Sequence, residues 1–221
     1  MTPEEILQAL YDETLVGNAP RVLELTNEGL TLDMEPQTLL FDALIPSLEE
    51  VGARFERGDF FVPEMLIAGR AMAGAMERLR PLLAETGVQT VGKFLMGTVK
   101  GDVHDIGKNL VNIMLEGAGF EVIDLGVQVA PEKFVQAIEE HQPDIVGFSA
   151  FLTTTMPMFK ANMNALEKAG IRGDVIVMVG GAPVTQEYAD AVGADGYAAD
   201  ASQTVKHAKR LMGEKRSKVP A

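Results

Sequence analysis

The sequence has no cysteine among its 221 residues. This absence excludes disulfide bonds, thiolate metal sites, iron–sulfur clusters and a cysteine nucleophile. It also lacks an apolar run approaching the ~20 residues that a membrane-spanning helix needs. The acidic start, from Met1 to Glu5, has none of the basic and apolar pattern of a signal peptide. We therefore expect a cytoplasmic protein.

Basic residues are few. The chain has 19 Lys and Arg against 32 Asp and Glu, which gives a formal net charge of −13. Nucleic acids and anionic membrane surfaces attract clustered positive charge, so we expect neither of them as a partner. The hydrophobic content of 47% supports a packed core.

Residues 1–88 carry only helical signals. Apolar residues recur at helical spacing in four segments, which are separated at Asn18-Ala19-Pro20, Met34-Glu35-Pro36 and Gly58-Asp59. Connections this short between helices favour a compact antiparallel arrangement. The sequence therefore predicts an N-terminal four-helix bundle that forms a cap domain.

The fourth helical segment, from Pro63 to about Leu83, has an unusual composition. Met65, Met72 and Met76 alternate there with alanines and glycines. One interpretation is close helix packing with methionine as a flexible gap filler. The other is an adaptable apolar lid over a flat ligand.

The pattern changes after a linker at Glu85–Gln89, where apolar strand-like runs begin to alternate with helical ones. Such alternation indicates right-handed βαβ units and a parallel sheet flanked by helices. We expect strands at 91–96, 121–124, 145–149, 175–179 and 196–198, and helices near 108–118, 131–141, 156–168, 186–192 and 201–212. The prediction is an α/β domain at 89–213 with a five-stranded parallel, Rossmann-like (flavodoxin-like) sheet, and a flexible tail at 214–221.

The segment Gly97–Gly107 follows the first predicted strand and contains the most conspicuous candidate residues. His104 lies between Asp102 and Asp105, with three glycines in the same segment. Open α/β sheets bind ligands at the carboxyl ends of their strands, and glycine allows a close approach of the backbone. A carboxylate that accepts one imidazole N–H fixes the tautomer of the ring.

His104 has few chemical roles open to it. Zinc sites need three or four protein ligands, and the sequence offers neither cysteine nor a second histidine near His104. A serine hydrolase of this fold class would need Gly-x-Ser-x-Gly, which is absent. The other histidines, His141 and His207, are expected to be solvated. A single imidazole suits a metal that arrives inside a macrocycle, as in haem or a corrin.

Two further strand ends carry candidate residues. The third strand is followed by Ser149 and by the run Thr153-Thr154-Thr155, which is either a helix N-cap cluster or a set of ligand contacts. The fourth strand is followed by Gly180-Gly181, which leaves room for a ligand. No Gly-x-Gly-x-x-Gly or Walker motif is present, so dinucleotide and ATP sites lack support.

A family resemblance enters at these residues. The run Asp102-Val103-His104-Asp105-Ile106-Gly107 is similar to the Asp-x-His-x-x-Gly motif of cobalamin-binding domains. The segment Gly52–Pro63 resembles their helical cap, and Gly126–Pro131 and Gly180-Gly181 also fit the family pattern. The whole chain resembles the small corrinoid proteins of anaerobic methyltransferase systems and the cobalamin-binding module of methionine synthase.

The resemblance implies a role for each matching residue. His104 would be the lower axial ligand of cobalt in base-off cobalamin or a related corrinoid, Asp102 its hydrogen-bond partner, and Thr155 the next member of the relay. Phe151 stands where the family has Leu in Ser-x-Leu, and its larger ring either narrows the slot for the nucleotide tail or repacks it. The cofactor-binding residues implied are Gly101, Asp102, Val103, His104, Asp105, Ile106, Gly107, Ser149, Phe151, Thr153, Gly180 and Gly181, with Phe61, Met65 and Leu66 as candidates from the cap.

The function implied is that of a methyl carrier. Its cobalt, as Co(I), would accept a methyl group from a substrate:corrinoid methyltransferase. It would pass that group to a corrinoid:tetrahydrofolate or corrinoid:thiol methyltransferase, with a reductive activation protein as a further partner. The chain would then be a subunit of a multi-component methyltransferase system, with methylamines, methoxylated aromatics, methanol, betaines and thiols all open as donors. The alternative is a cobalamin-dependent sensor or regulator that acts through protein contacts.

Overall fold

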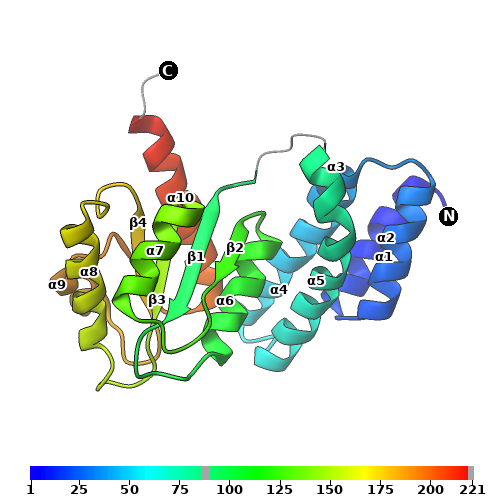
Figure 1. The fold of residues 1–221 in the computed structure, drawn as a ribbon. Helices are drawn as coiled ribbons and strands as arrows, with labels where there is room; N and C mark the ends of the chain where they lie inside the picture. Colours follow the sequence, from blue (N-terminus) through cyan, green and yellow to red (C-terminus); the bar gives the residue numbers. More distant parts are fainter. Residues whose placement is uncertain (86–89, 219–221) are drawn as a thin grey trace. The chain divides into compact units, whose positions relative to one another are not determined.

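The computed structural model describes residues 1–85 and 90–218 of the chain (Figure 1). Two compact units are distinguished. One comprises Met1–Thr90 together with Glu116–Gly119, and the other comprises the rest of the chain from Val91 onward. Residues 86–89, where the sequence places most of the linker and the boundary between the domains, lie outside the described part.

The first unit is helical. Its helices are α1 (Pro3–Leu15), α2 (Ala19–Thr31), α3 (Pro36–Leu39), the π-helical turn η1 (Leu40–Leu44), α4 (Ile45–Arg57) and α5 (Val62–Glu85). The α1 helix begins with a capping box, in which Thr2 and Glu5 each accept a hydrogen bond from the other's backbone N–H. Because α3, η1 and α4 are continuous, the described helices form four rods, as the sequence predicts.

The third rod contains the π-helical turn because of a proline. Pro46 lies inside this continuous helix and has no N–H to donate to the carbonyl four residues earlier. The helix accommodates this loss by widening for one turn, and the Ile45 N–H donates to the Leu40 carbonyl five residues away. The sequence pattern predicts an ordinary helix here, and the structure differs from it at this turn.

The methionines of α5 differ in burial. Met65 and Met72 have 0% and 1% of their surfaces exposed, and Met76 is half-buried. This burial favours the interpretation of Met65 and Met72 as packing groups in the core.

The second unit is the predicted five-stranded parallel sheet with flanking helices. Its strands are β1 (Lys93–Thr98), β2 (Glu121–Asp124), β3 (Ile145–Ser149), β4 (Ile176–Gly180) and β5 (Gly196–Ala198). Its helices are α6 (Ile106–Gly117), α7 (Pro131–His141), α8 (Pro157–Ala169), α9 (Gln186–Val192) and α10 (Ala201–Lys218). The strand order β2-β1-β3-β4-β5 is the flavodoxin-like order.

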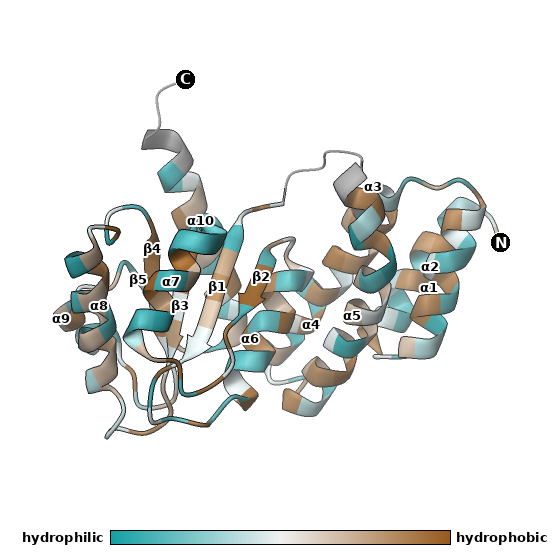
Figure 2. Ribbon diagram, in the orientation of Figure 1, coloured by the Kyte–Doolittle hydropathy of each residue, from teal (hydrophilic) through white to brown (hydrophobic). Residues whose placement is uncertain are grey.

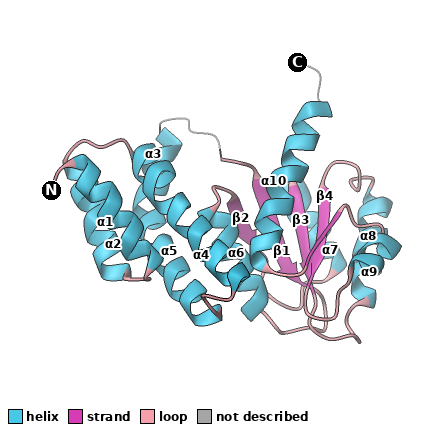
Figure 3. Cartoon of the chain, turned by 180° about the vertical axis from the view of Figure 1, so that it is seen from behind, coloured by secondary structure: helices cyan, strands magenta, loops and turns pink. Residues whose placement is uncertain are grey.

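Helices cover both faces of this sheet. Figure 1 shows α7 and α8 in front of the strands, and Figure 3, seen from behind, shows α10 across the opposite face. The α7–α9 side holds the larger apolar core, in which Phe134, Phe148 and Phe159 are fully buried. The strands are correspondingly apolar, with β2 and β4 among the brown segments of Figure 2.

The topology creates a switch point between β1 and β3. The strand β1 pairs with β2 on one side and with β3 on the other, and open α/β sheets bind ligands at the carboxyl ends of the strands at such a point. The last residues of the strands on this edge form one row of small side chains in register, namely Thr98, Ser149, Gly180 and Ala198.

The C-terminal helix is longer than the sequence suggests. The prediction ended the helix at about residue 212 and began a flexible tail at 214, whereas α10 continues to Lys218. Residues 219–221 of the predicted tail lie outside the described part. Among the described helices, none combines the length and apolar character required to cross a bilayer.

Candidate functional site

The loop after β1 folds around the carboxylate of Asp102. This side chain is fully buried, and its Oδ1 accepts a hydrogen bond from the backbone N–H of His104 at 3.0 Å. The same oxygen lies 2.7 Å from Nδ1 of the His104 ring. Two contacts from one residue to one oxygen hold the backbone and the ring of His104 against the carboxylate.

The second carboxylate oxygen connects this loop to the one after β3. Asp102 Oδ2 accepts hydrogen bonds from the backbone N–H groups of Phe151 at 2.8 Å and Leu152 at 3.1 Å, and from the Thr155 hydroxyl at 2.7 Å. Thr155 is buried, and its hydroxyl also lies 2.8 Å from the Leu152 carbonyl oxygen. Residues about 50 positions apart in the sequence are thus joined through one buried anion.

These donors decide the charge of Asp102. Burial alone would raise its pKa, but the hydrogen bonds from Thr155, His104 and Phe151 outweigh burial and hold the pKa well below the usual range. Asp102 is therefore ionised at neutral pH and only accepts hydrogen bonds. The proton between the two side chains belongs to His104 Nδ1, so in the neutral form of the ring the lone pair is on Nε2.

Nε2 of His104 is available to a ligand. The side chain is 44% exposed, and no hydrogen bond to Nε2 is found within the described part of the chain. A neutral imidazole with Nδ1 held by a carboxylate is the form in which histidine binds metal ions.

Hydrogen bonds to the backbone that the sequence did not indicate also position the loop after β1. The buried Thr98, the last residue of β1, donates from its hydroxyl to the His104 carbonyl at 3.1 Å. From the loop after β2, the Gln128 N–H donates to the Asp102 carbonyl, and Val129 forms a parallel bridge with Val99. The only sequence signal for Thr98 is a hydroxyl residue at the strand exit.

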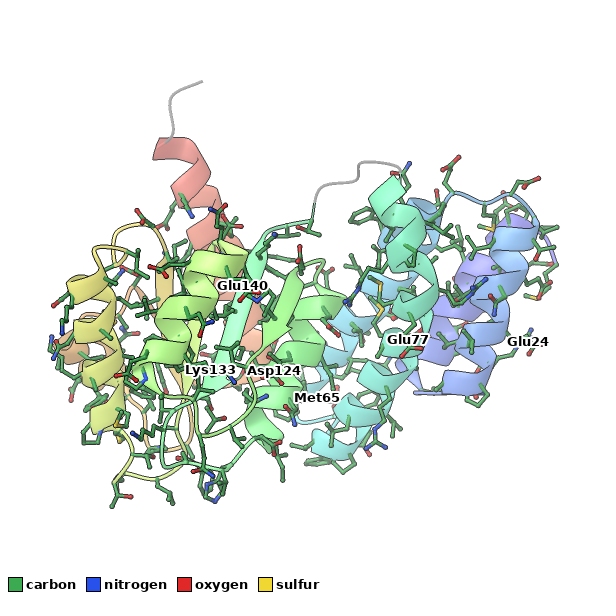
Figure 4. All side chains as sticks on the ribbon, viewed as in Figure 1. Glu24, Met65, Glu77, Asp124, Lys133 and Glu140 are labelled. Carbon is green, nitrogen blue, oxygen red and sulfur yellow. The ribbon has the colours of Figure 1, made fainter. Side chains whose placement is uncertain are left out.

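A second missed feature is the buried amine of Lys108 at the start of α6. Its side chain is 1% exposed and forms an ion pair with Asp124, the last residue of β2, labelled in Figure 4. Lys108 Nζ also donates to Asn109 Oδ1 at 2.6 Å, and Asp124 Oδ1 accepts from the Gly126 N–H at 2.8 Å. The ion pair links the first turn of α6, which follows the loop of His104, to the end of β2.

The two partners of this ion pair are expected to respond unequally to mutation. Asp124→Ala leaves a buried ammonium with Asn109 alone, whereas Lys108→Met leaves a carboxylate that is 38% exposed and reaches water. We expect Asp124→Ala to lower the free energy of unfolding by about 2 kcal/mol more than Lys108→Met, because an uncompensated buried charge is the costlier of the two. Urea denaturation measures both, with Asp124→Asn as the control that retains an acceptor. Equal losses would contradict the assigned burial.

The threonine run behaves differently from a helix cap. Thr153 and Thr154 are exposed, Thr155 is bonded to Asp102, and α8 has no side-chain cap at its first turn. The N-cap interpretation is therefore wrong. Thr155 instead belongs to the histidine network, which matches the relay position implied by the resemblance.

The glycines divide into two groups. Gly181 has φ +125°, and a Cβ there would lie 1.9 Å from the Ala150 carbonyl oxygen, so the fold itself requires glycine. Gly101 also has a positive φ, +84°. By contrast, a Cβ on Gly107 would meet nothing within 4 Å, and one on Gly180 would meet only the Ala198 carbonyl oxygen at 3.4 Å. The chain's own packing therefore does not require glycine at these two positions.

Exposed apolar side chains lie on the loops that carry the histidine and its contacts and on the first residue of α6. They belong to Val103, Ile106, Val127, Phe151 and Leu152, whose exposures range from 37% to 70%. The ring of Phe151 stacks on His104, with ring centroids 4.5 Å apart and planes 27° from parallel. A half-exposed imidazole on apolar loops suits a ligand that is itself largely apolar.

The remaining candidates lie apart from this network. Ser149 is half-buried in the row of small residues, and Asp105 accepts from the Asn109 amide at 3.1 Å. In the helical unit Phe61 is 65% exposed, Leu66 is half-buried and Met65 is buried.

The other two histidines provide no alternative site. His141 is half-buried at the end of α7. His207 is also half-buried, and its Nδ1 lies 2.6 Å from the Tyr197 carbonyl oxygen, so the expectation of a solvated side chain is wrong for His207. Within residues 1–85 and 90–218, no group of three or more His, Cys, Asp or Glu side chains could hold a metal ion.

These observations fit a corrinoid. His104 supplies one nitrogen with a free lone pair, apolar side chains project from the neighbouring loops, and the chain's own packing does not require the glycines Gly107 and Gly180. A lone imidazole holds a bare ion weakly, but it is sufficient for a metal whose other ligands come from a macrocycle. The fold and the site together are those expected of a protein that binds a macrocycle-held metal at the switch point of a flavodoxin-like sheet.

Comparisons with known proteins agree with this class. Two family models match, each described as a B12 binding domain, at residues 92–206 and 6–80. The chain is 40% identical to dimethylamine corrinoid protein 1 of Methanosarcina acetivorans, over 96% of this chain and 100% of that protein. The chain belongs to the family of B12-binding corrinoid proteins.

Two solved structures are also similar. A cobalamin-binding protein from Desulfitobacterium hafniense is 32% identical with a TM-score of 0.74, over 95% of this chain and 98% of that one. A chain of the methanol:cobalamin methyltransferase complex from Methanosarcina barkeri is 27% identical with a TM-score of 0.84, over 99% of this chain and 86% of that one.

Proposed function

We propose that the chain is a corrinoid methyl carrier that serves two methyltransferases. The observation that carries the proposal is His104, whose Nδ1 is held by the ionised Asp102 while Nε2 is free. When bound, the corrinoid supplies a cobalt atom that takes up and releases a methyl group. The protein would supply the His104 Nε2 as a ligand of the cobalt, exposed apolar side chains against the macrocycle, and the small residues Ser149 and Gly180 beside the nucleotide tail.

The network around Asp102 gives each neighbour a role in this proposal. His104 would hold the cobalt through Nε2, and Asp102 would orient the ring and keep its proton on Nδ1. Thr155 donates to Oδ2 of Asp102. This contact completes a chain of hydrogen bonds from the His104 imidazole, through the carboxylate, to the loop after β3. Outer partners of this kind raise the basicity of a ligating histidine.

The predicted contacts from the helical unit also belong to the proposal. Phe61 and Leu66 have exposed surface with which to contact the corrinoid. Met65 is buried among the helices, so we propose that it supports its neighbours by packing unless the helices move apart. A cap of this kind shields a reactive centre between transfers and opens for partners.

The partners proposed are a substrate:corrinoid methyltransferase, a corrinoid:tetrahydrofolate or corrinoid:thiol methyltransferase, and a reductive activation protein. A methylamine is the first donor to test, because the relative from Methanosarcina acetivorans is a dimethylamine corrinoid protein. Methanol is the second, because of the structural similarity to the methanol:cobalamin methyltransferase complex. The proposal includes a cytoplasmic location, where these enzymes and a reductant are available.

Reconstitution provides the test of this function. The purified chain, refolded with cobalamin and reduced, should give a coloured complex whose absorption changes on addition of dimethylamine together with its methyltransferase. Omitting the methyltransferase is the control and should leave the spectrum unchanged. A chain that stays colourless after reconstitution would overturn the proposal.

The alternative, a cobalamin-dependent sensor, receives no support from the comparisons. The same experiment separates the two functions. A sensor would bind the corrinoid without reacting with any pair of donor and methyltransferase.

A further inference from the structure

The stacking of Phe151 on His104 lies outside the roles that the sequence implied. The sequence placed Phe151 in the slot for the nucleotide tail, yet its ring lies against the imidazole at a centroid distance of 4.5 Å and an angle of 27°. Phe151 is 52% exposed, so the side chain is not held in this position by burial in the core.

The hydrogen bond from His104 to Asp102 does not by itself determine the plane of the imidazole ring. The His104 N–H holds the backbone on Oδ1, and the 2.7 Å contact restrains only the distance from Nδ1 to that oxygen, so coupled changes of the two side-chain torsions can still tilt the ring without losing the bond. Such tilting changes the direction of the Nε2 lone pair. A second surface that contacts the face of the ring is needed to fix its direction, and Phe151 provides that surface.

Phe151 is itself held by the same carboxylate. Its backbone N–H donates to Asp102 Oδ2 at 2.8 Å, while Oδ1 of that carboxylate holds His104. The preceding residue, Ala150, is buried in the core, so the chain enters Phe151 from a rigid position. The two rings therefore keep a defined mutual geometry even though both are partly exposed.

We propose that Phe151 is a positioning residue, which fixes the plane of the His104 imidazole and so favours coordination by Nε2. This inference rests on the proposed function, because it assumes that His104 is an axial ligand. Leucine, which the family pattern has at this position, would contact the imidazole without presenting an aromatic face. Phe151 thus makes a stacking contact with the imidazole where leucine would make only an apolar contact. The strength of a stacking contact depends on the relative orientation of the two rings.

The first test needs no corrinoid. In the apoprotein, nuclear magnetic resonance of labelled histidine should show the His104 ring protons shifted upfield by the Phe151 ring and in close contact with it. Phe151→Ala and Phe151→Leu should remove the upfield shift, and Phe151→Trp should retain it. An unchanged His104 signal in Phe151→Ala would overturn the inference. Phe41→Ala, which removes a phenyl ring of similar exposure in the helical unit, is the matched control.

The second test measures coordination in the reconstituted protein. The ratio of histidine-bound to histidine-free corrinoid is read from absorption and from nitrogen splitting in the paramagnetic resonance of the cobalt(II) form. We expect Phe151→Ala to lower this ratio about three- to tenfold, the range for losing one aromatic pair, and Phe151→Trp to restore it. A residue that only supports the fold would change the melting temperature without changing this ratio.

The outcomes separate this inference from the proposed function. If the wild-type chain takes up no corrinoid, the proposed function fails, and the positioning role fails with it even if the rings stack in the apoprotein. If the wild type binds corrinoid through His104 and Phe151→Ala does so equally well, the inference fails and the proposed function stands.

Discussion

Replacing His104 by alanine is expected to weaken corrinoid binding by about 100-fold and to remove the histidine-bound absorption spectrum. The reason is that Nε2 of His104 is the one imidazole nitrogen offered at this edge of the sheet, and loss of an outer partner alone costs about 10- to 100-fold in metal affinity. Titration of the apoprotein with cobalamin, followed by absorbance, measures both quantities. Methyl transfer between the two partner enzymes should fall in parallel.

Two controls make this result specific to His104. His141→Ala removes a half-buried imidazole in the same unit and should leave the spectrum unchanged. Free imidazole added to His104→Ala should restore a nitrogen-bound spectrum, because it fills the vacated position. A His104→Ala protein whose spectrum equals that of the wild type would show that another group is the ligand.

Replacing Asp102 by asparagine is expected to lower the free energy of unfolding by about 3–5 kcal/mol at neutral pH. Asparagine has one oxygen and one amide nitrogen, so its NH2 group must face either the His104 donors or the N–H groups of Phe151 and Leu152. Leaving two or three buried donors unpaired costs about 1–3 kcal/mol each. Urea denaturation of the apoprotein measures the change.

The cost of this substitution should depend on pH in a defined direction. The pKa of Asp102 is lower in the folded state than the ordinary value of about 4 in an unfolded chain. Its contribution to stability is therefore fully present above pH ~4 and is lost as the pH falls toward the lowered pKa. The difference between wild type and Asp102→Asn should accordingly shrink below pH ~4.

Asp105 provides the matched control for Asp102. It lies three residues away in the same loop, is half-buried and accepts one side-chain hydrogen bond, from Asn109. Asp105→Asn should cost less than about 1 kcal/mol, because the amide oxygen of asparagine can still accept the one hydrogen bond from Asn109. Similar losses from both substitutions would contradict the assignment of Asp102 as the centre of the network.

Much of the fold was predictable from local patterns. The parallel sheet follows from the alternation of apolar runs and helical segments, and four of the five helices of the second unit lie within two residues of their predicted bounds. The π-helical turn at Leu40–Leu44 was missed because the apolar spacing around Pro46 stays compatible with an ordinary helix. The extension of α10 to Lys218 was missed because its last turn is polar.

The sequence by itself determined the fold class, the switch-point loop and the identity of its histidine, because these depend on residue types at short spacings. Asp102 and His104 are two positions apart, so their contact follows from the loop alone. The family resemblance implied Thr155 as a distant member of this network, but only the tertiary structure shows its contact with Asp102 and adds the Phe151 ring. The fold brought Thr155 and the Phe151 ring to that loop from the end of β3, because parallel strands carry segments about 50 residues apart to one edge of the sheet.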